Sequence, residues 1–338
     1  MASFSICVPA YNCGNTIFDC IESVLQQNYT NWEVIIVDDG SSNETARTLD
    51  SIAAQNRDRV SVVHTENKGP YLARQIAFGR ARNDYILCLD SDDLFMGNDV
   101  LSSLNKVAEK YSPDLVMFNG TADLKSKKKF VDYSGIANEK FAHVSKNRFR
   151  LELIKSYKLN NLAFKMIRTS ILKSSPKYNG RLTMAEDRFQ VLQIADAISS
   201  IYVIDQLFYY YKPSANSTTH SEYRYEYFEQ ACIVEELSHK LAVNWGVPIN
   251  EWSRLFQAIS YGAVRAIRET VRPYRKRAEL YRKILNSPCY QYAVQVTRNS
   301  DGRCDRKIGN LLLKNEAFPV LDVYLIGMVL LLRFLKLA

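Results

Sequence analysis

The sequence lacks several motifs that identify common enzyme and secreted-protein classes. No GxGxxG and no GxxxxGK[ST] occurs in its 338 residues, which disfavours a Rossmann dehydrogenase and a P-loop enzyme. Residues 1–12 contain neither a basic stretch nor a cleavable apolar run, so we expect no signal peptide. The seven cysteines are scattered and form no CxxC pair, which favours reduced thiols in a cytosolic protein over a zinc site.

A membrane-spanning hydrophobic segment is also missing. The most apolar segment, residues 317–338, has an uncharged run of only ten residues, 323–332, which is too short to cross a bilayer. Residues 254–314 before it carry 14 Lys or Arg and 4 Asp or Glu. A basic stretch beside an apolar helix predicts peripheral contact with an anionic membrane. The alternatives are a solubilising basic surface and a terminal helix that is buried or makes a homo-oligomer contact. Only the basic stretch favours nucleic acid, and we expect no such partner.

What is present is an alternation of short apolar runs and segments of helical periodicity. The runs that predict buried strands are residues 4–8 (ended by Pro9), 33–37, 60–64, 85–89 and 114–118. Four helices are predicted between these runs. The first begins after Asn15, the second ends near residue 54, and the other two span residues 71–82 and 100–110. This alternation predicts an α/β fold with a doubly wound, mostly parallel sheet. We place this domain at 1–220 and a helical, basic module at 221–338, with helices over 221–245 and 252–272.

Three carboxylates follow the fourth apolar run directly, in Asp90-Ser91-Asp92-Asp93. They would lie at the carboxyl end of a strand, where open α/β sheets bind ligands. Carboxylates this close repel one another unless a cation neutralises them. Mg²⁺ or Mn²⁺ bridging to a diphosphate would do so, because Mg²⁺ is usually held by one or two carboxylates and phosphate oxygens. The alternative is an acidic turn in which Asp92 or Asp93 caps a helix that starts near Gly97.

Two other predicted strands also end in polar residues. The first is followed by Pro9, Tyr11 and Asn12, and the second by Asp39. If these strands are neighbours of the fourth, all three loops meet, and a nucleotide base would stack on Tyr11 and donate a hydrogen bond to Asp39. A turn containing Lys68 and Gly69, with Arg74 after it, would supply cations near a phosphate. Alternatively, Arg74 is a surface residue of a helix.

Several segments resemble family 2 glycosyltransferases, which are inverting enzymes of the GT-A fold that use nucleotide-diphosphate sugars. The ordered matches are PAYN (9–12), VDDGS (37–41), NKGPYLAR (67–74) and YILCLDSDD (85–93), which contains the DXD pattern of the family. Looser matches are KMIR (165–168), AEDRF (185–189) and YYYK (209–212). They extend the resemblance to residues 1–220 and point to bacterial enzymes that build capsule, exopolysaccharide or cell-wall glycans. Gln75 and Ala77 depart from the residues that the family often has there.

The resemblance implies roles for the acidic residues. An inverting transfer needs a base for the acceptor hydroxyl, and the resemblance gives that role to Asp187, with Glu186 orienting it or the acceptor. The alternative is that Glu186 and Asp187 form an N-cap pair on a helix. Asp90 would bind the ribose, Asp92 the metal and Asp93 would support the site, with Ser91 between them. His220 is either a third metal ligand or a solvated loop residue.

The expected function is transfer of a sugar from a nucleotide-sugar donor, with UDP as its nucleotide, to a glycan or lipid-linked acceptor. The expected location is the cytoplasmic face of the membrane. The alternatives are a sugar-nucleotide-binding scaffold subunit that has lost catalysis, and a nucleotidyltransferase. Intact Asp92 and Asp187 disfavour the scaffold. No Gly-rich, Lys-bearing loop follows the first strand, which disfavours the nucleotidyltransferase.

Overall fold

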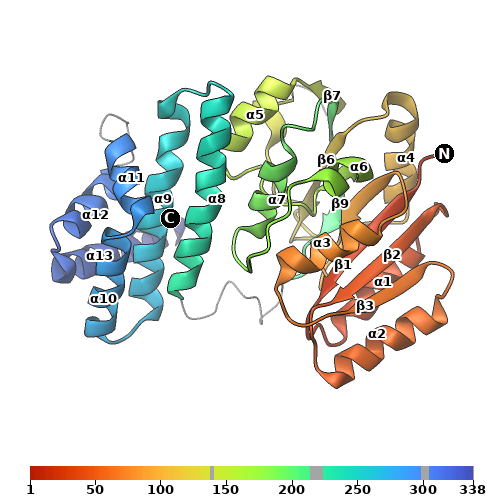
Figure 1. The fold of residues 1–338 in the computed structure, drawn as a ribbon, viewed down its shortest axis with the longest axis horizontal. Coiled ribbons are helices and arrows are strands. Elements are labelled where there is room, and N and C mark those ends of the chain that lie inside the picture. Colours follow the sequence, from red (N-terminus) through yellow and green to blue (C-terminus); the bar gives the residue numbers. More distant parts are fainter. Residues whose placement is uncertain (138–140, 214–223, 298–303, 338) are drawn as a thin grey trace. The chain divides into compact units, whose positions relative to one another are not determined.

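The structure is a computed structural model that describes residues 1–137, 141–213, 224–297 and 304–337 (Figure 1). The chain divides into two compact units, one of Met1–Leu153 with Tyr157–Asn216 and one of Ile154–Ser156 with Ser217–Ala338. The first is built from strands and helices, and the second from helices. The predicted domain boundary at residue 220 falls outside the described residues.

A nine-stranded mixed sheet forms the centre of the first unit. Its strands are β1 (Phe4–Ala10), β2 (Trp32–Asp38), β3 (Val60–His64), β4 (Tyr85–Cys88), β5 (Leu94–Phe95), β6 (Leu115–Thr121), β7 (Phe141–Val144), β8 (Lys165–Arg168) and β9 (Ile201–Tyr210). Their spatial order is β3-β2-β1-β4-β8-β6-β9-β5, and β7 pairs with β9. The predicted parallel pairing holds for β1 to β4, whereas β8 enters between β4 and β6 antiparallel to both.

The first strand runs through Pro9 to Ala10, so the prediction that Pro9 ends it is wrong. Pro9 is opposite Val37 of β2, but pairing with β4 stops at Cys7 and Cys88. The ladder bond from Leu89 to Cys7 shows that alternate residues of β1 face β4, and Pro9 is the next residue on that side. Its missing N–H therefore costs no sheet hydrogen bond, because no paired strand lies opposite it.

Helices cover the sheet in the predicted alternation. The helices of this unit are α1 (Thr16–Leu25), α2 (Asn43–Gln55), α3 (Pro70–Arg80), α4 (Val100–Tyr111), α5 (Lys146–Lys155, whose last two residues are assigned to the second unit), α6 (Thr169–Ser174) and α7 (Glu186–Ile194), with a 3₁₀ turn at Tyr133–Gly135. The α4 helix starts at Val100 after Asp99, and β5 lies before it. Neither Asp92 nor Asp93 caps a helix, so that alternative is wrong.

The strand order reverses at β1, between β2 and β4. From β1 the chain adds β2 and β3 on one side and then returns to place β4 on the other. In open α/β sheets, ligands bind outside the carboxyl ends of strands where the order reverses in this way. The polar loops that follow β1, β2 and β4 meet at the carboxyl ends of these strands, because β2 and β4 both pair with β1 in the parallel direction.

The second unit is helical. Its helices are α8 (Tyr225–Asn244), α9 (Ile249–Thr270), α10 (Tyr274–Leu285), α11 (Pro288–Thr297), α12 (Cys304–Lys314) and α13 (Phe318–Leu337). The α9 helix contacts each of the other five, so it is the centre of the unit. The helices α8 and α9 confirm the two predicted over 221–245 and 252–272.

The terminal helix α13 buries one side and exposes another. Leu321 and Leu325 are buried, and so is Asp322, which accepts hydrogen bonds from Arg277 (2.6 Å) and Tyr281 (2.8 Å). The buried-helix alternative therefore holds for this side. The exposed apolar residues of the same helix are Val320, Val323 and Ile326. Within the described ranges, no helix combines the length and apolarity that a membrane crossing requires.

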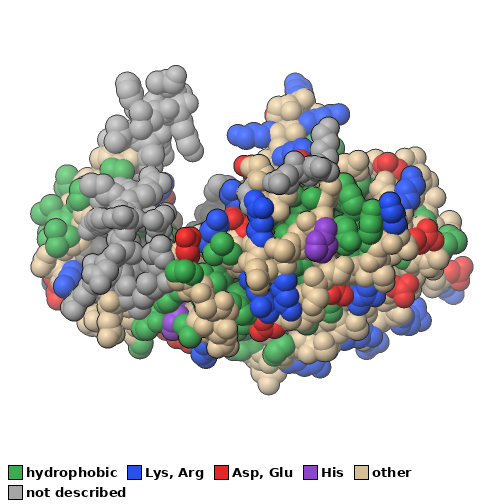
Figure 2. Space-filling view, turned by 90° about the horizontal axis from the view of Figure 1, so that it is seen from above, with side chains coloured by type: hydrophobic (Ala, Val, Ile, Leu, Met, Phe, Trp, Pro, Cys, Tyr) green, Lys and Arg blue, Asp and Glu red, His purple; other side chains and the backbone are tan. Residues whose placement is uncertain are grey.

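The basic segment is partly neutralised inside this unit. Arg265 pairs with Glu269 at 2.8 Å, and Arg282 pairs with Glu316 at 3.2 Å. Arg277 pairs with the buried Asp322. On the first unit, the face drawn in Figure 2 likewise carries Lys and Arg side chains with Asp and Glu side chains among them. The formal charge of this segment is therefore larger than the charge that it offers to a partner.

Candidate active site

Side-chain and main-chain hydrogen bonds join the three loops that follow β1, β2 and β4. The main-chain N–H of Asn12 donates to Oγ of Ser41 (2.9 Å), and Oδ1 of Asn12 accepts from the N–H of Ser42 (2.8 Å). These bonds tie the loop after β1 to the loop after β2. Thr16 of α1 donates to the main-chain oxygen of Ser91 (3.0 Å), which fixes the loop after β4. The loops thus form one connected surface.

Asp39 is buried at the end of β2 and binds the turn before α3. Its two carboxylate oxygens accept the main-chain N–H groups of Lys68 (2.7 Å) and Gly69 (2.9 Å). Gly40 allows this approach, because it has φ +74° and a Cβ there would lie 2.6 Å from the Asn67 nitrogen. Tyr11 is 55% exposed and so presents its ring to solvent. The arrangement leaves an open aromatic face near a carboxylate of fixed orientation.

The turn at residues 67–69 also touches the segment before α7. Gly69 has φ +92°, and a Cβ on it would lie 3.1 Å from both the Leu182 oxygen and the Thr183 methyl group. Arg181 donates a hydrogen bond to the Asn67 side chain at 2.8 Å. Only a glycine allows this close approach, because other residues would be strained at this φ.

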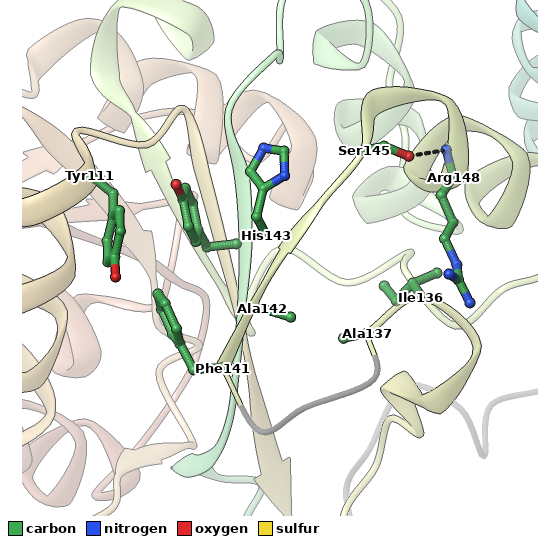
Figure 3. Close-up of a pocket in the computed structure, with 9 residues that line it drawn as sticks. Tyr111, Ile136, Ala137, Phe141, Ala142, His143, Ser145 and Arg148 are labelled. Atoms are coloured by element: carbon green, nitrogen blue, oxygen red, sulfur yellow. Dashed lines mark hydrogen bonds between the residues drawn. The ribbon is translucent and has the colours of Figure 1, made fainter.

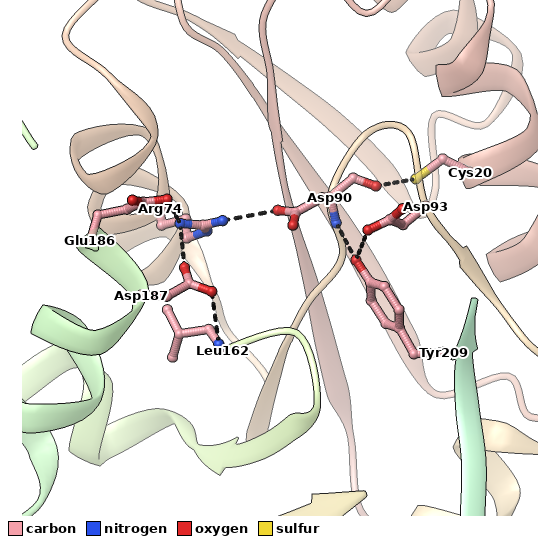
Figure 4. Close-up of polar contacts among 8 residues, drawn as sticks. All are labelled: Cys20, Arg74, Asp90, Asp93, Leu162, Glu186, Asp187 and Tyr209. Atoms are coloured by element: carbon pink, nitrogen blue, oxygen red, sulfur yellow. Dashed lines mark hydrogen bonds and ion pairs between the residues drawn. The ribbon is translucent and has the colours of Figure 1, made fainter. Parts of the chain in front are cut away.

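The acidic loop, residues 90–93, is held in place by β9 (Figure 4). The Tyr209 hydroxyl donates to Asp93 at 2.6 Å and accepts the N–H of Asp90 at 3.2 Å. The N–H of Lys212 donates to the other oxygen of Asp93. Burial raises the pKa of Asp93 to about 7, and the charges of Asp90 and Asp92 add to this effect. Asp93 therefore anchors the acidic loop to Tyr209 and Lys212.

Asp92 is half-buried, and no cation among the described residues is a cause of its pKa shift. Burial is the main cause that raises the pKa of Asp92, and the charge of Asp90 raises it further. A divalent cation would relieve both effects, so Asp92 fits the predicted metal site. No cluster of three or more metal-ligating side chains occurs in the part of the chain that the structure describes. His220, the predicted third ligand, lies outside the described residues.

Arg74 joins the acidic loop to the acidic pair, Glu186 and Asp187 (Figure 4). Its guanidinium lies 2.9 Å from Asp90, 2.7 Å from Asp187 and 3.3 Å from Glu186. The side chain is 5% exposed, so the alternative of a surface helix residue is wrong. Burial would lower the pKa of Arg74, but Asp187, Asp90 and Glu186 raise it well above its usual range. Arg74 is thus a permanently charged bridge.

The acidic pair occupies the first turn of α7, after Ala185 at the N-cap position. The N-cap alternative is therefore wrong for both residues. Oδ2 of Asp187 accepts the main-chain N–H of Leu162 at 3.1 Å. Burial raises the pKa of Asp187, although the charge of Arg74 opposes this effect. Burial also raises the pKa of Glu186, and the neighbouring charge of Asp187 raises it further. A carboxylate with a raised pKa is a stronger base once ionised, as proton abstraction requires.

Three groups at this site were not among the predicted site residues. They are the Tyr209 hydroxyl, the Leu162 N–H and the side chain of Lys165, which is buried near Asp187. A signal existed for one of them, because Lys165 interrupts an apolar run between Phe164 and Met166. The other two depend on contacts between distant segments.

A separate hollow of about 650 Å³ lies elsewhere in the first unit and is lined by β7, the end of α4 and the start of β9 (Figure 3). The ring centroid of Tyr202 lies 4.7 Å from that of Tyr111 and 5.5 Å from that of Phe141, so the rings pack on one another. Strands β6 and β9 begin here, and β6 runs in the same direction as β4. The hollow therefore lies at the opposite end of the strands from the acidic loop.

Comparisons with known proteins agree with this geometry. The model of the family described as Glycosyl transferase family 2 matches residues 5–174, half of the chain. Glycosyltransferase GlyG of Streptococcus pneumoniae serotype 4 is 28% identical over an alignment of 254 residues that covers 70% of this chain and 79% of GlyG. Poly(ribitol-phosphate) beta-N-acetylglucosaminyltransferase TarS of Staphylococcus aureus is 26% identical over 214 residues, covering 62% of this chain but only 35% of TarS.

A solved structure shares the fold. The crystal structure of S. aureus TarS 1-349 in complex with UDP-GlcNAc superposes with a TM-score of 0.66. It covers 96% of this chain and 91% of that one at 17% identity. This likeness confirms the predicted GT-A type of α/β fold with a helical extension. The chain is a glycosyltransferase and belongs to glycosyl transferase family 2.

Proposed function

We propose that this enzyme transfers a sugar from a nucleotide-diphosphate sugar, with UDP as the nucleotide, to a hydroxyl group of a glycan or lipid-linked acceptor. The transfer inverts the anomeric centre and serves cell-surface polysaccharide synthesis. One observation carries the proposal: Arg74 lies within 3 Å of both Asp90 and Asp187, so the donor-side loop and the base share one site. The UDP-GlcNAc bound in the TarS crystal structure supports the choice of donor.

The donor would lie across the ends of β1, β2 and β4. Its base would stack on the exposed ring of Tyr11, beside Pro9 and Asn12, and donate to Asp39. Asp39 already accepts two main-chain N–H groups, so its orientation is fixed before a ligand binds. Asp90 and Ser91 would receive the ribose. The exposed side chain of Lys68 can reach a phosphate, whereas Arg74 is occupied by three carboxylates.

Asp187 would act as the base. Its carboxylate would accept the proton of the acceptor hydroxyl as that oxygen attacks the anomeric carbon. Arg74 and the Leu162 N–H bind its two oxygens and so keep its orientation constant, and Glu186 would orient the acceptor. Asp92, with His220, would hold Mg²⁺ or Mn²⁺. Such an ion stabilises the charge that develops on a departing diphosphate.

Turnover of defined donors tests this function. The full chain would be incubated with Mn²⁺ and a panel of nucleotide sugars, each with and without glycan acceptors, while nucleotide release is recorded. We expect release from UDP-sugars that is abolished by chelation. Tight UDP-sugar binding without release under any acceptor would instead support the scaffold alternative, and pyrophosphate formation from a nucleotide triphosphate would support nucleotidyl transfer.

We also propose peripheral contact of the second unit with an anionic membrane at its cytoplasmic face, where lipid-linked acceptors would be met. The exposed apolar side of α13, with Val320, Val323 and Ile326, supports this, as do the exposed cations Arg272 and Arg275. Each cation that reaches an anionic surface contributes roughly 1 kcal/mol.

Co-sedimentation with anionic and neutral vesicles tests the membrane proposal. Binding to anionic vesicles at low salt should be strong and should decline in 1 M salt, where the screening length is about 3 Å. Val323→Asp, on the exposed side of α13, should reduce binding without unfolding the chain. Absence of binding at low salt would refute the proposal. Concentration-dependent dimerisation abolished by Val323→Asp would show that this side is a homo-oligomer contact.

A further inference from the structure

Lys165, the first residue of β8, is a buried cation near the acidic pair. Only 2% of the residue is exposed. The neighbouring residues of the strand, Met166 and Ile167, are also buried, and β8 is flanked by β4 and β6. Burying an ammonium group costs free energy unless acceptors surround it. Its place in an apolar strand therefore points to a role that an apolar residue would not supply.

A single peptide unit connects Lys165 to the acidic pair. The Lys165 ammonium donates a hydrogen bond to the main-chain oxygen of Asn161. The peptide bond that carries this oxygen also carries the Leu162 N–H, which donates to Oδ2 of Asp187 at 3.1 Å. The main-chain N–H of Lys165 donates to the Leu162 oxygen at 3.1 Å, which closes the turn between them.

This connection has two physical consequences. Because a peptide unit is planar, the direction of its C=O fixes the direction of its N–H, so the lysine sets the angle at which Asp187 is held. Hydrogen bonds in a chain polarise one another, so a cation on the C=O makes the N–H a stronger donor. Both effects act on the oxygen of Asp187 that Arg74 does not bind.

A second cation holds the same segment from the other side. Arg188, the residue after Asp187, is 1% exposed and donates to the Asn160 side chain and to the Leu153 oxygen, both at 2.9 Å. Lys165 therefore fixes the peptide bond between Asn161 and Leu162. Arg188 of α7 fixes Asn160, the residue that precedes this peptide bond. A segment held at two points can keep a base in one orientation.

We propose that Lys165 is a positioning residue for Asp187 and acts through the peptide bond between Asn161 and Leu162. This inference rests on the proposed role of Asp187 as the base. The charged groups that face Asp187 are Arg74 from α3, Asp90 after β4, Glu186 from α7 and Lys165 from β8, and Lys165 itself faces Asp187 and the thiol of Cys88. Among them, Arg74 and Lys165 favour the ionised form of Asp187.

Lys165→Met tests the proposal, because it keeps the length of the side chain and removes the ammonium group. We expect kcat to fall roughly ten- to hundredfold, as for a displaced catalytic group, while KM for the donor stays unchanged. The acidic limb of the kcat–pH profile should shift to higher pH, because Lys165 no longer lowers the pKa of Asp187. If Lys165→Met does not fold, Lys165→Gln, which retains a donor without the charge, should show the same shift.

Arg168→Met is the matched control, since it removes a cation from the same strand that pairs with Asp114 at 3.1 Å. It should change the melting temperature but not the pH profile. A folded Lys165 variant with normal kcat and an unshifted acidic limb would overturn the positioning role. Failure of the proposed function would appear in the wild type, which would release no nucleotide from any donor, whereas failure of the proposed base role would leave Asp187→Asn active in transfer.

Discussion

The acidic loop and the acidic pair both concentrate carboxylates, but the protein surrounds them with different groups. The pair faces two buried cations, Arg74 and Lys165. In the acidic loop, Asp93 receives a hydroxyl and a main-chain N–H, and Asp92 has no cation among the groups that shift its pKa. The protein thus supplies cations to the pair and to Asp90, which shares Arg74 with the pair, whereas no described cation lowers the pKa of Asp92, which would depend on what a ligand brings.

This difference separates two kinds of catalytic electrostatics. A base must keep its position through every turnover, so the permanent charge of Arg74 suits it. A diphosphate leaves after each turnover, and a cation that binds with it can be exchanged together with the product. Four substitutions, from the largest expected effect to the smallest, distinguish the two sides.

Asp187→Asn should have the largest effect on rate. The amide keeps the size of the carboxylate and can still meet the Leu162 N–H, but it cannot accept a proton. Loss of a general base typically lowers the rate about 10²–10⁴-fold. Donor affinity measured by calorimetry should stay within about twofold, because Asp187 is proposed to face the acceptor. Near-normal transfer would mean that Asp187 is structural.

Arg74→Met should have the largest effect on stability. It leaves Asp90, Glu186 and Asp187 without their shared partner, and breaking a buried ion pair costs roughly 3–5 kcal/mol, an upper range here because all three carboxylates keep some exposure. Urea unfolding would measure this. Arg82→Met is the control, because Arg82 is also in an ion pair, with Glu33 at 2.8 Å, but is 82% exposed. Its cost should be below about 1 kcal/mol. Equal costs would contradict the central position of Arg74.

Asp92→Asn should abolish the dependence on metal rather than the fold. We expect donor affinity in Mn²⁺ to fall about tenfold or more, to the level that the wild-type protein shows in chelator. Unfolding should be little changed, because the group is half-buried and burial already raises its pKa. Asp99→Asn, an exposed aspartate before α4, is the control. A variant that still gains affinity from metal would exclude Asp92 as a ligand.

Lys165→Met should have the smallest effect on stability at neutral pH, and its effect should appear as a change in the pH dependence of stability. Burial lowers the pKa of Lys165 to about 7 from the usual 10.5, so above neutral pH the unfolded state binds more protons than the folded state. The free energy of unfolding of the wild type should therefore rise with pH relative to the variant, by up to about 1.4 kcal/mol per pH unit between pH 7 and 10. Parallel curves would show that Lys165 titrates normally.

The donor side of the site could be predicted from the sequence because its parts are local. Each polar loop directly follows an apolar run, so Asp39 and Asp90 are placed as soon as the runs are recognised as neighbouring strands. The strand order that the structure shows meets this condition. The roles assigned to these residues stay predictions.

The base side could not be predicted in the same way. Its geometry depends on β8, which enters the sheet between β4 and β6 in the antiparallel direction. The sequence of residues 165–168 does not specify that this strand pairs with β4 and β6. The proximity of Lys165 to Asp187 could therefore not be predicted from the sequence. The burial of Arg74 likewise follows from carboxylates up to 113 positions away in the chain, and periodicity carries no such information.

The bonds from Tyr209 and Lys212 to Asp93 have a consequence for synthesis on the ribosome. A nascent chain that has emerged as far as β4 already contains every strand end of the donor side, yet its acidic loop still lacks the hydroxyl and the N–H that fix it. Since chains emerge from the N-terminus, a donor-competent state must wait until residue 212 is free to fold. Chains truncated between residues 175 and 200 should therefore bind no donor in calorimetry, although they include all of residues 5–174 that the family model matches.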